Sequence, residues 1–298
     1  MTLLFRAVLF LGLVAPVLAA APLRVVTLHS VLTEIATEVG GPEVAVTALL
    51  KAGADPHTFN PAPTDVRTLA QAELILGSGF GLEPYLDKLV ANSGTKARIA
   101  LARAVIRETV PTACRHGGHA HTHEEIDPHW WHGLANVRAV TQLVRDQLAA
   151  LRPAAAAQFA ARATAYAARL DQLAAWAQTE IATLPPARRQ LVTSHEAFGY
   201  LARDFGFTIH SLQGVNPEAE PSARALAALI DLIKRERIRA VFPDSTENPK
   251  LLAAMLRESG ATLGGTLYAD GPGGADTPAA TFAGMYRHNL TTIVGALR

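Results

Sequence analysis

Cysteine is almost absent from this chain of 298 residues, since Cys114 is the only one. An intramolecular disulfide is therefore impossible, and the folded chain must depend on packing of the hydrophobic residues that make up 49% of it. An excess of either charge is also missing, because 27 Lys and Arg face 26 Asp and Glu. A chain so balanced has no electrostatic reason to bind nucleic acid or an anionic membrane.

Long hydrophobic runs are lacking as well, because no segment offers the roughly 20 apolar residues that a bilayer-spanning helix needs. The apolar run Ala7–Ala15 is shorter, follows Arg6, and precedes Pro16 and the small residues Ala19–Ala21. This pattern is typical of a secretory signal peptide. We expect residues 1–21 to be cleaved on export to the periplasm, and the absence of a nearby cysteine argues against a lipid anchor there.

Short hydrophobic segments alternate with helix-compatible segments in the first half of the remaining chain. The predicted strands are Leu23–Leu28, Val44–Leu50, Leu74–Leu76 and Arg98–Leu101, and the predicted helices are Val31–Val39, Thr64–Gln71 and Pro84–Val90. Such alternation favours a mostly parallel sheet, because a parallel crossover needs a helix to cover the sheet. We therefore expect residues 22–152 to form an N-terminal α/β lobe.

An Ala-rich stretch without internal glycine or proline follows. Its larger apolar residues recur mostly at three, four or seven positions: Phe159, Tyr166, Leu170, Leu173, Trp176 and Ile181. Alanine has the highest helix propensity, and this spacing forms one apolar stripe. Pro153–Leu184 therefore predicts one helix of roughly 30 residues, about 45 Å long, ended by Pro185-Pro186. We assign residues 153–187 to a linking helix.

The alternation then resumes to the end of the chain. The predicted strands are Gln190–Thr193, Phe207–Leu212, Arg239–Phe242 and Ala261–Tyr268, and the predicted helices are Ala197–Phe205, Ser222–Arg237, Lys250–Ser259 and Ala279–Leu297. Residues 188–298 thus predict a C-terminal α/β lobe of similar size. The expected fold is α/β, with two similar lobes joined by one long helix and a cleft beyond the carboxyl ends of the strands, where ligands of such sheets bind.

Four metal-competent side chains fall in loops that could meet in this cleft. His57 and His195 follow predicted strands, Asp270 follows the last predicted strand, and His129 precedes a helix that begins near Asn136. Three imidazoles and one carboxylate, two from each lobe, form a set suited to tetrahedral Zn²⁺. A lone histidine after a strand is more often a surface or capping residue, and an aspartate before glycine is an ordinary turn signal. Spacing alone leaves both interpretations open.

Several segments, in this order and spacing, resemble the zinc- and manganese-binding solute-binding proteins of ABC importers. They include GADPHTFNPAPTDVRTLAQAELIL, DPHWWHGLANV, TSHEAFGYLARDFGF and LYADGPGG, and the resemblance covers essentially the whole chain after residue 21. It implies two lobes joined by a backbone helix. It also implies that the metal is held by His57, His129, His195 and Asp270.

The chain departs from this family in places. After Asp127-Pro128-His129, the family commonly has a Leu-Asp-Pro type stretch, where this chain has Trp130-Trp131-His132-Gly133, so the role of His132 stays open. Asp244 stands where relatives often carry glutamate, and we interpret it as supporting a ligand or as structural. Asp276 is an alternative to Asp270, although it lies farther out in a Gly-rich loop.

The remaining histidines have several interpretations. His116, His119, His121 and His123 lie among Gly, Ala, Thr and Glu in residues 115–128, which predicts a mobile loop. Ordering such a loop costs backbone entropy, so we expect auxiliary, low-affinity metal binding there, with a solvated low-complexity insert as the alternative. His29 ends the first strand and could approach the cleft. Trp130 and Trp131 are expected to wall the site or to pack in the interior.

The donor set favours zinc, because nitrogen-rich sites bind Zn²⁺ above Mn²⁺, and manganese sites add oxygen ligands. The resemblance implies a monomeric periplasmic receptor that captures Zn²⁺ and delivers it to an ABC permease of the inner membrane, with a periplasmic metallochaperone as a second candidate partner. A manganese or iron receptor, a secreted zinc hydrolase and an adhesin on the same scaffold are the alternatives. Against the hydrolase, His195-Glu196 lacks the second histidine of an HExxH helix.

Overall fold

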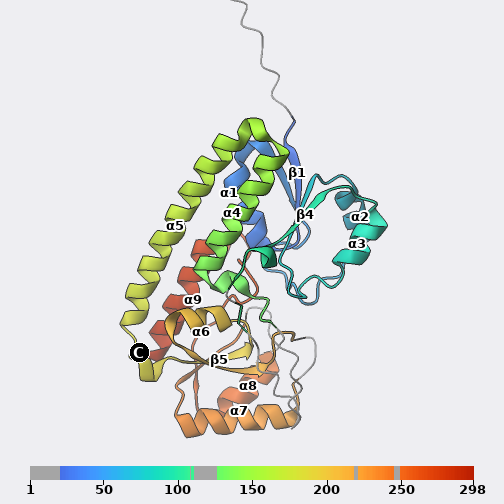
Figure 1. Ribbon diagram of the computed structural model, residues 1–298. Helices are drawn as coiled ribbons and strands as arrows, with labels where there is room; N and C mark the ends of the chain where they lie inside the picture. The colour runs from blue at the N-terminus through green and yellow to red at the C-terminus, as the bar shows by residue number, and fades with distance from the viewer. Residues whose placement is uncertain (1–20, 108, 111–125, 218–220, 245–248) are drawn as a thin grey trace, which may run out of the picture.

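The computed structural model describes residues 21–107, 109–110, 126–217, 221–244 and 249–298. They form two lobes, one above the other in Figure 1, with a long helix running along both. Each lobe contains a parallel sheet of four strands. The α/β fold predicted from the alternation of strands and helices is confirmed.

The N-terminal sheet has the strand order β2-β1-β3-β4. Its strands are β1 (Leu23–Thr27), β2 (Val44–Ala48), β3 (Leu74–Gly77) and β4 (Arg98–Leu101), and its connecting helices are α1 (Ser30–Gly40), α2 (Pro63–Ala70) and α3 (Leu86–Ser93). Successive strand residues point to opposite faces. Val25 and Leu74 therefore join the core beneath α1, whereas Val26 and Ile75 join the core beneath α2 and α3.

The C-terminal sheet has the equivalent order β6-β5-β7-β8. Its strands are β5 (Gln190–His195), β6 (Thr208–Gln213), β7 (Ala240–Phe242) and β8 (Thr262–Leu263), and its helices are α6 (Gly199–Phe205), α7 (Ala223–Glu236), α8 (Pro249–Ser259) and α9 (Phe282–Leu297). Ser222 caps α7 by accepting a hydrogen bond from the Ala225 N–H at 3.1 Å. Apolar residues of α7 pack on Val192 and Val241 of the sheet.

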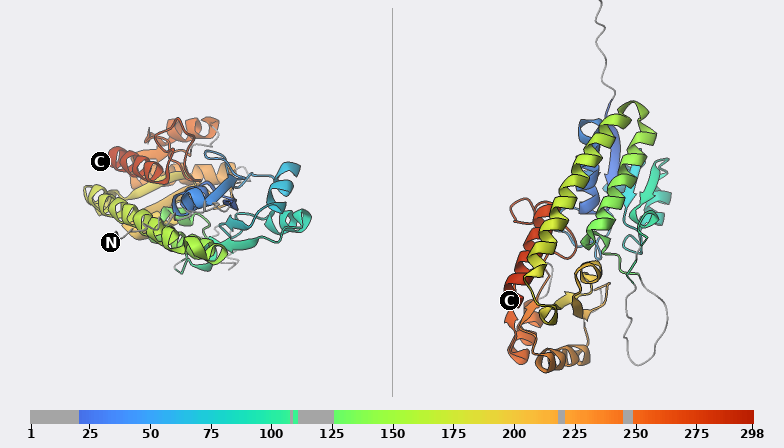
Figure 2. Two further views of the ribbon diagram at one scale, coloured as in Figure 1. Left: turned by 90° about the horizontal axis from the view of Figure 1, so that it is seen from above. Right: turned by 60° about the vertical axis from the view of Figure 1, so that its left-hand side comes forward.

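The linking helix is α5 (Ala156–Ala182), whose 27 residues span about 40 Å. It begins three residues later than predicted, because Pro153–Ala155 form a 3₁₀ turn after α4 (Leu134–Leu151). α5 packs against α1, α4 and α9, and in the right-hand view of Figure 2 α4 lies beside its first half and α9 beside its second. Its buried stripe, which includes Phe159 and Leu170, is therefore shared between the lobes.

The last strand is shorter than predicted. The sequence indicates a strand over Ala261–Tyr268, but β8 is only Thr262–Leu263, and beyond it a single bridge joins Leu267 to Asp244. Two glycines explain the interruption. A side chain at Gly264 would collide with the Phe242 ring, and Gly265 has a φ of +119°, which disfavours other residues.

Within the described residues, no helix is both long and apolar enough to cross a membrane. The predicted signal peptide and the histidine-rich segment 115–128 lie largely outside the described residues, so the structure does not test either prediction.

Candidate metal centre

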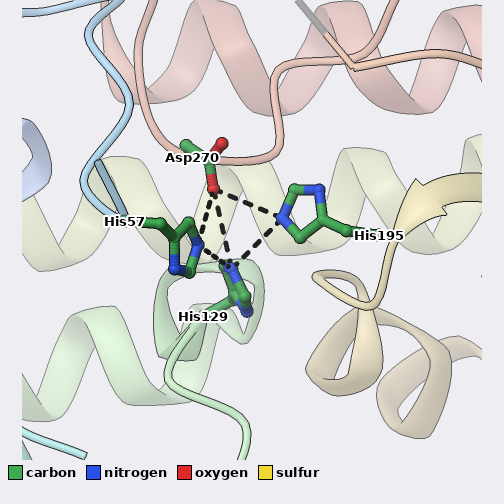
Figure 3. A group of neighbouring side chains, drawn as sticks. All are labelled: His57, His129, His195 and Asp270. Carbon is green, nitrogen blue, oxygen red and sulfur yellow. Dashed lines mark hydrogen bonds and ion pairs between the residues drawn. The ribbon is translucent and has the colours of Figure 1, made fainter. Parts of the chain in front are cut away.

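Four side chains from four separate segments converge between the lobes. They are His57 from the loop after β2, His129 from the segment before the 3₁₀ turn η3 (Trp130–His132), His195 at the end of β5, and Asp270 from the loop after β8. Figure 3 shows the three rings and the carboxylate pointing toward a common centre. The exposed fractions of these side chains are only 4%, 0%, 4% and 6%. The structure thus brings together the four residues named from the sequence as candidate ligands.

Five of the six distances between the converging atoms are close to those of a tetrahedron, and all four atoms lie within 4.8 Å of one another. The Nε2 atom of His129 lies 3.1 Å from that of His57 and 3.4 Å from that of His195. Asp270 Oδ1 lies 3.4, 3.6 and 3.4 Å from the Nε2 atoms of His57, His129 and His195. Ligands held tetrahedrally at zinc bond lengths are about 3.3 Å apart. The arrangement could thus surround one zinc ion with little movement.

The two Asp-Pro-His segments adopt the same local structure. In each, the aspartate Oδ1 accepts a hydrogen bond from the backbone N–H of the histidine two residues later, at 2.8 Å for Asp55 and His57 and 2.9 Å for Asp127 and His129. This Asx turn explains why aspartate precedes both histidines. Asp55 also accepts a hydrogen bond from the Thr58 hydroxyl, whereas Asp127 also accepts one from the His129 ring.

Asp127 orients the His129 ring and changes its charge. The Nδ1–H of His129 donates to Asp127 Oδ1 at 2.7 Å, which leaves Nε2 facing the centre. Such carboxylate partners fix the ring and increase its strength as a ligand. Burial lowers the pKa of His129, but the Asp127 and Asp270 carboxylates outweigh burial and raise it to about 9. The ring is therefore protonated at neutral pH until a metal displaces the proton.

The pKa values of His195 and Asp270 are also shifted by the charged groups around them. Burial lowers the pKa of His195, but Asp270 and Asp244 raise it above its usual value, and Asp244 Oδ2 lies 3.4 Å from His195 Nδ1. Burial raises the pKa of Asp270, but the three histidine rings hold it well below its usual range. Asp270 Oδ1 is buried and, within the described residues, makes no ordinary hydrogen bond. Such a carboxylate oxygen is suited to a cation.

Other residues named from the sequence lie outside this cluster. Asp276 is exposed, so Asp270 is the carboxylate that reaches the centre. His210 bonds Gln190 Oε1 at 2.9 Å and His288 bonds the Thr266 carbonyl at 3.0 Å, which are structural contacts. The predicted auxiliary ligands belong to the segment that the structure does not describe, and they are His116, His119, His121 and His123.

The sequence allowed two roles for Trp130 and Trp131, a wall of the site or packing in the interior, and each tryptophan has one of these roles. Both are fully buried, and the Trp131 ring lies edge-on to His129 with 5.3 Å between centroids, so it walls the centre. Trp130 packs in the interior next to Trp131. Together they exclude water on the side of η3.

Sequence reasoning missed the roles of His29 and His132. Both are fully buried, and their Nε2 atoms bond the backbone carbonyls of Asp270 at 3.1 Å and Ala269 at 2.7 Å. Burial lowers the pKa of each to about 3, so both rings are neutral. No sequence signal reveals these bonds, because they join positions more than 130 residues apart.

Comparison with known proteins agrees with this geometry. Residues 25–296 match the family described as "Zinc-uptake complex component A periplasmic". The chain is 32% identical to the manganese-binding lipoprotein MntA of Bacillus subtilis (93% of this chain, 90% of the relative). It is 32% identical to the zinc-binding protein TroA of Treponema pallidum (92% and 88%) and 30% identical to the iron-binding protein YfeA of Yersinia pestis (92% and 86%).

The fold is shared with a solved relative. The structure of the periplasmic zinc-binding protein TroA from Treponema pallidum superposes with a TM-score of 0.83 at 30% identity, covering 93% of this chain and 99% of that one. Sequence and fold therefore agree over nearly the whole length. The chain belongs to the family of periplasmic zinc-uptake components, which are metal-binding solute-binding proteins of ABC importers.

Proposed function

We propose that this protein captures Zn²⁺ outside the cytoplasm and delivers it to an ABC permease of the inner membrane. The ligands would be Nε2 of His57, His129 and His195 and Oδ1 of Asp270. The observation that carries the proposal is that five of the six distances between these atoms are 3.1–3.6 Å, close to the spacing of ligands around a tetrahedral zinc ion.

The choice of zinc depends on the donor atoms, because the relatives are named for manganese, zinc and iron. Three neutral imidazoles and one carboxylate oxygen favour Zn²⁺, whereas Mn²⁺ favours oxygen donors and more of them. A manganese or iron receptor remains the alternative. Asp270 is the one carboxylate among the four residues of the cluster, so the cluster offers a manganese or iron ion at most two oxygen atoms.

Competition titration against a chromophoric zinc chelator tests the proposal. The wild-type protein, stripped of metal, should bind one zinc ion tightly and Mn²⁺ far more weakly. His57→Ala, His129→Ala, His195→Ala and Asp270→Ala should each weaken zinc binding, while His210→Ala serves as a control, since the His210 ring bonds Gln190 and lies outside the cluster. Tighter binding of Mn²⁺ than of Zn²⁺ would contradict the assignment.

The family's members are transport receptors and not enzymes, so the secreted zinc hydrolase is not favoured. The geometry supports the same conclusion, because a catalytic zinc usually has three protein ligands and a water. Here four protein atoms surround the centre. A site of this kind holds an ion rather than activating water.

We also propose that residues 1–21 are a cleaved signal peptide, and that residues 22–152, 153–187 and 188–298 are the N-terminal lobe, the linking helix and the C-terminal lobe. The apolar run after Arg6 and the small residues Ala19–Ala21 support cleavage. Mass spectrometry of the exported protein should find a chain that begins near residue 22. A full-length exported chain would contradict this.

His116, His119, His121 and His123 are proposed as an auxiliary, weaker zinc site. Imidazoles at spacings of two or three residues can bind a metal, but ordering the segment costs backbone entropy. Deletion of residues 116–123 should lower the number of zinc ions bound in calorimetry and leave the tightest one. Loss of the tightest ion would instead place it in this segment.

A further inference from the structure

Three ring N–H groups converge on two consecutive backbone carbonyls beside the metal centre. Trp131 Nε1 donates to the Ala269 carbonyl at 2.8 Å, and His132 Nε2 contacts the same oxygen at 2.7 Å. His29 Nε2 contacts the next carbonyl, that of Asp270, at 3.1 Å. The three rings come from the start of α1 and from η3, whereas both carbonyls belong to the loop after β8.

The protonation of both histidines follows from their partners. The Nδ1 atom of His29 accepts a hydrogen bond from the Val31 N–H at 3.3 Å and caps α1, so its proton is on Nε2 and is donated to Asp270. His132 Nε2 must also carry a proton, since a carbonyl oxygen can only accept. The three rings form one buried group, in which His29 stacks on Trp131 with 4.1 Å between centroids and the His132 ring lies tilted to Trp131 at 6.0 Å.

One ring nitrogen of His132 makes this contact, and the other ring nitrogen lies in a buried environment. Its Nδ1 is buried and has no hydrogen-bond partner within the described residues. A buried acceptor without a partner destabilises a protein. An apolar side chain at this position would avoid that cost but would lose the hydrogen bond to Ala269.

The loop that carries Asp270 is held by its own lobe as far as Tyr268, through the bridge of Leu267 to Asp244 and the hydrogen bonds of Tyr268 with Asn289. The strand before it ends at Leu263, and Gly271 directly follows Asp270 with a φ of +127°. Another contact to the N-terminal lobe joins the Gly53 N–H to the Pro272 carbonyl at 2.9 Å. Side chains of the N-terminal lobe therefore hold the carbonyls of Ala269 and Asp270, whereas Tyr268 just before them is held by Asn289 of α9.

We propose that His29, Trp131 and His132 are positioning residues that hold the backbone of Ala269 and Asp270 so that Asp270 Oδ1 faces the metal. This inference rests on the proposed zinc site. Because His129 immediately precedes η3, the same rings fix Asp270 relative to His129. Two candidate ligands come from each lobe, as predicted from the sequence, but the backbone of Asp270 is also hydrogen-bonded by a side chain of the N-terminal lobe.

Paired substitutions at His29 separate helix capping from positioning. His29→Asn retains a side-chain acceptor that caps α1 but is too short to reach Asp270. His29→Gln can place a donor near the position of Nε2. We expect His29→Asn to weaken zinc binding about 10–100-fold, the usual effect of removing a partner that supports a ligand, and His29→Gln to weaken it less. His132→Leu and Trp131→Phe should also weaken binding.

A double-mutant cycle distinguishes positioning from general destabilisation. In the Asp270→Ala background, His29→Asn should cause no further loss of zinc affinity, because the ligand that it positions is gone. In the His57→Ala background, His29→Asn should still weaken binding. An equal loss in the Asp270→Ala and wild-type backgrounds would overturn the proposal.

Cobalt substitution provides a readout of geometry that does not depend on stability. Tetrahedral Co²⁺ absorbs visible light more strongly than Co²⁺ of higher coordination, so His29→Asn and Asp270→Ala should weaken the band alike, while His210→Ala leaves it unchanged. An unaltered band in His29→Asn would overturn the positioning role. Failure of the wild-type protein to bind zinc tightly would instead overturn the proposed function on which it rests.

Discussion

At the scale of the residue, the repeated Asp-Pro-His segments make a matched pair. Asp127 and Asp55 both hold the backbone of a candidate ligand, but only Asp127 also accepts a hydrogen bond from the ring, at 2.7 Å. The same motif therefore supports one histidine through its backbone and the other through both backbone and side chain.

We expect Asp127→Ala to lower zinc affinity about 10–100-fold, because the His129 ring loses the carboxylate that orients it. Asp55→Ala removes the equivalent Asx turn without a ring contact and should have a smaller effect. Competition titration of both variants measures the difference. Equal losses would mean that the turn, and not the ring contact, supports the site.

The charge of His129 predicts proton release. Its pKa is raised to about 9 in the metal-free protein, so at pH 7.5 the ring carries a proton that zinc must displace. Affinity should therefore keep rising as pH increases toward 9, rather than levelling off near the usual histidine pKa of about 6.5. Calorimetry in buffers of different ionisation enthalpy should show about one or more protons released per zinc. No dependence on the buffer would contradict this.

The limits of sequence reasoning are clear at these residues. His57, His129, His195 and Asp270 were predictable, because each follows a strand or precedes a helix in segments that resemble a known family. The role of His29 was not, because its partner is 241 positions away and is a backbone carbonyl, which has no sequence signature.

At the scale of the element, Glu34 joins three helices from both lobes. This residue of α1 accepts hydrogen bonds from the Tyr166 hydroxyl of α5 at 3.1 Å and from the Phe282 N–H at the start of α9 at 2.6 Å. Burial raises the pKa of Glu34, although these hydrogen bonds act in the opposite direction. A carboxylate at a helix N-terminus also interacts favourably with the helix dipole.

We expect Glu34→Ala to lower the free energy of unfolding by about 1–3 kcal/mol, because the buried Phe282 N–H and Tyr166 hydroxyl lose their acceptor. Glu38→Ala, one turn later on α1, removes only an exposed ion pair with Arg169 and should cost less than about 1 kcal/mol. Urea denaturation of the two variants tests the contrast. A larger loss for Glu38→Ala would refute it.

The predicted and observed ends of two strands show when the local sequence is enough to place a strand. The strand Arg98–Leu101 was predicted with its observed limits, since a short hydrophobic run is enough to define it. The strand predicted over Ala261–Tyr268 was wrong in length. Its interruption depends on how closely Phe242 approaches Gly264, a contact between separate strands that a single sequence does not display.

At the scale of the whole molecule, the candidate ligands join the two lobes, which also meet along α5 and α9 and where η3 packs against α6. Zinc binds the folded protein, and its ligands are far apart in an unfolded chain. Binding should therefore stabilise both lobes as a unit, by about 2.7 kcal/mol when free zinc is 100 times the dissociation constant.

Denaturation of the metal-free and zinc-loaded protein measures this stabilisation. A single transition that moves to higher denaturant with zinc is the expected result, and Asp270→Ala should show a smaller movement at the same zinc concentration. An unchanged transition in the wild-type protein would mean that zinc does not bind the folded state at this site.

The order of the ligands along the chain also matters during synthesis. His57 and His129 are 72 positions apart, His195 follows 66 positions later, and Asp270 comes last. A growing polypeptide on the ribosome thus contains only two of the four candidate ligands long before the other two exist. Binding by all four donors is therefore a property of the finished fold, in which both lobes have been made.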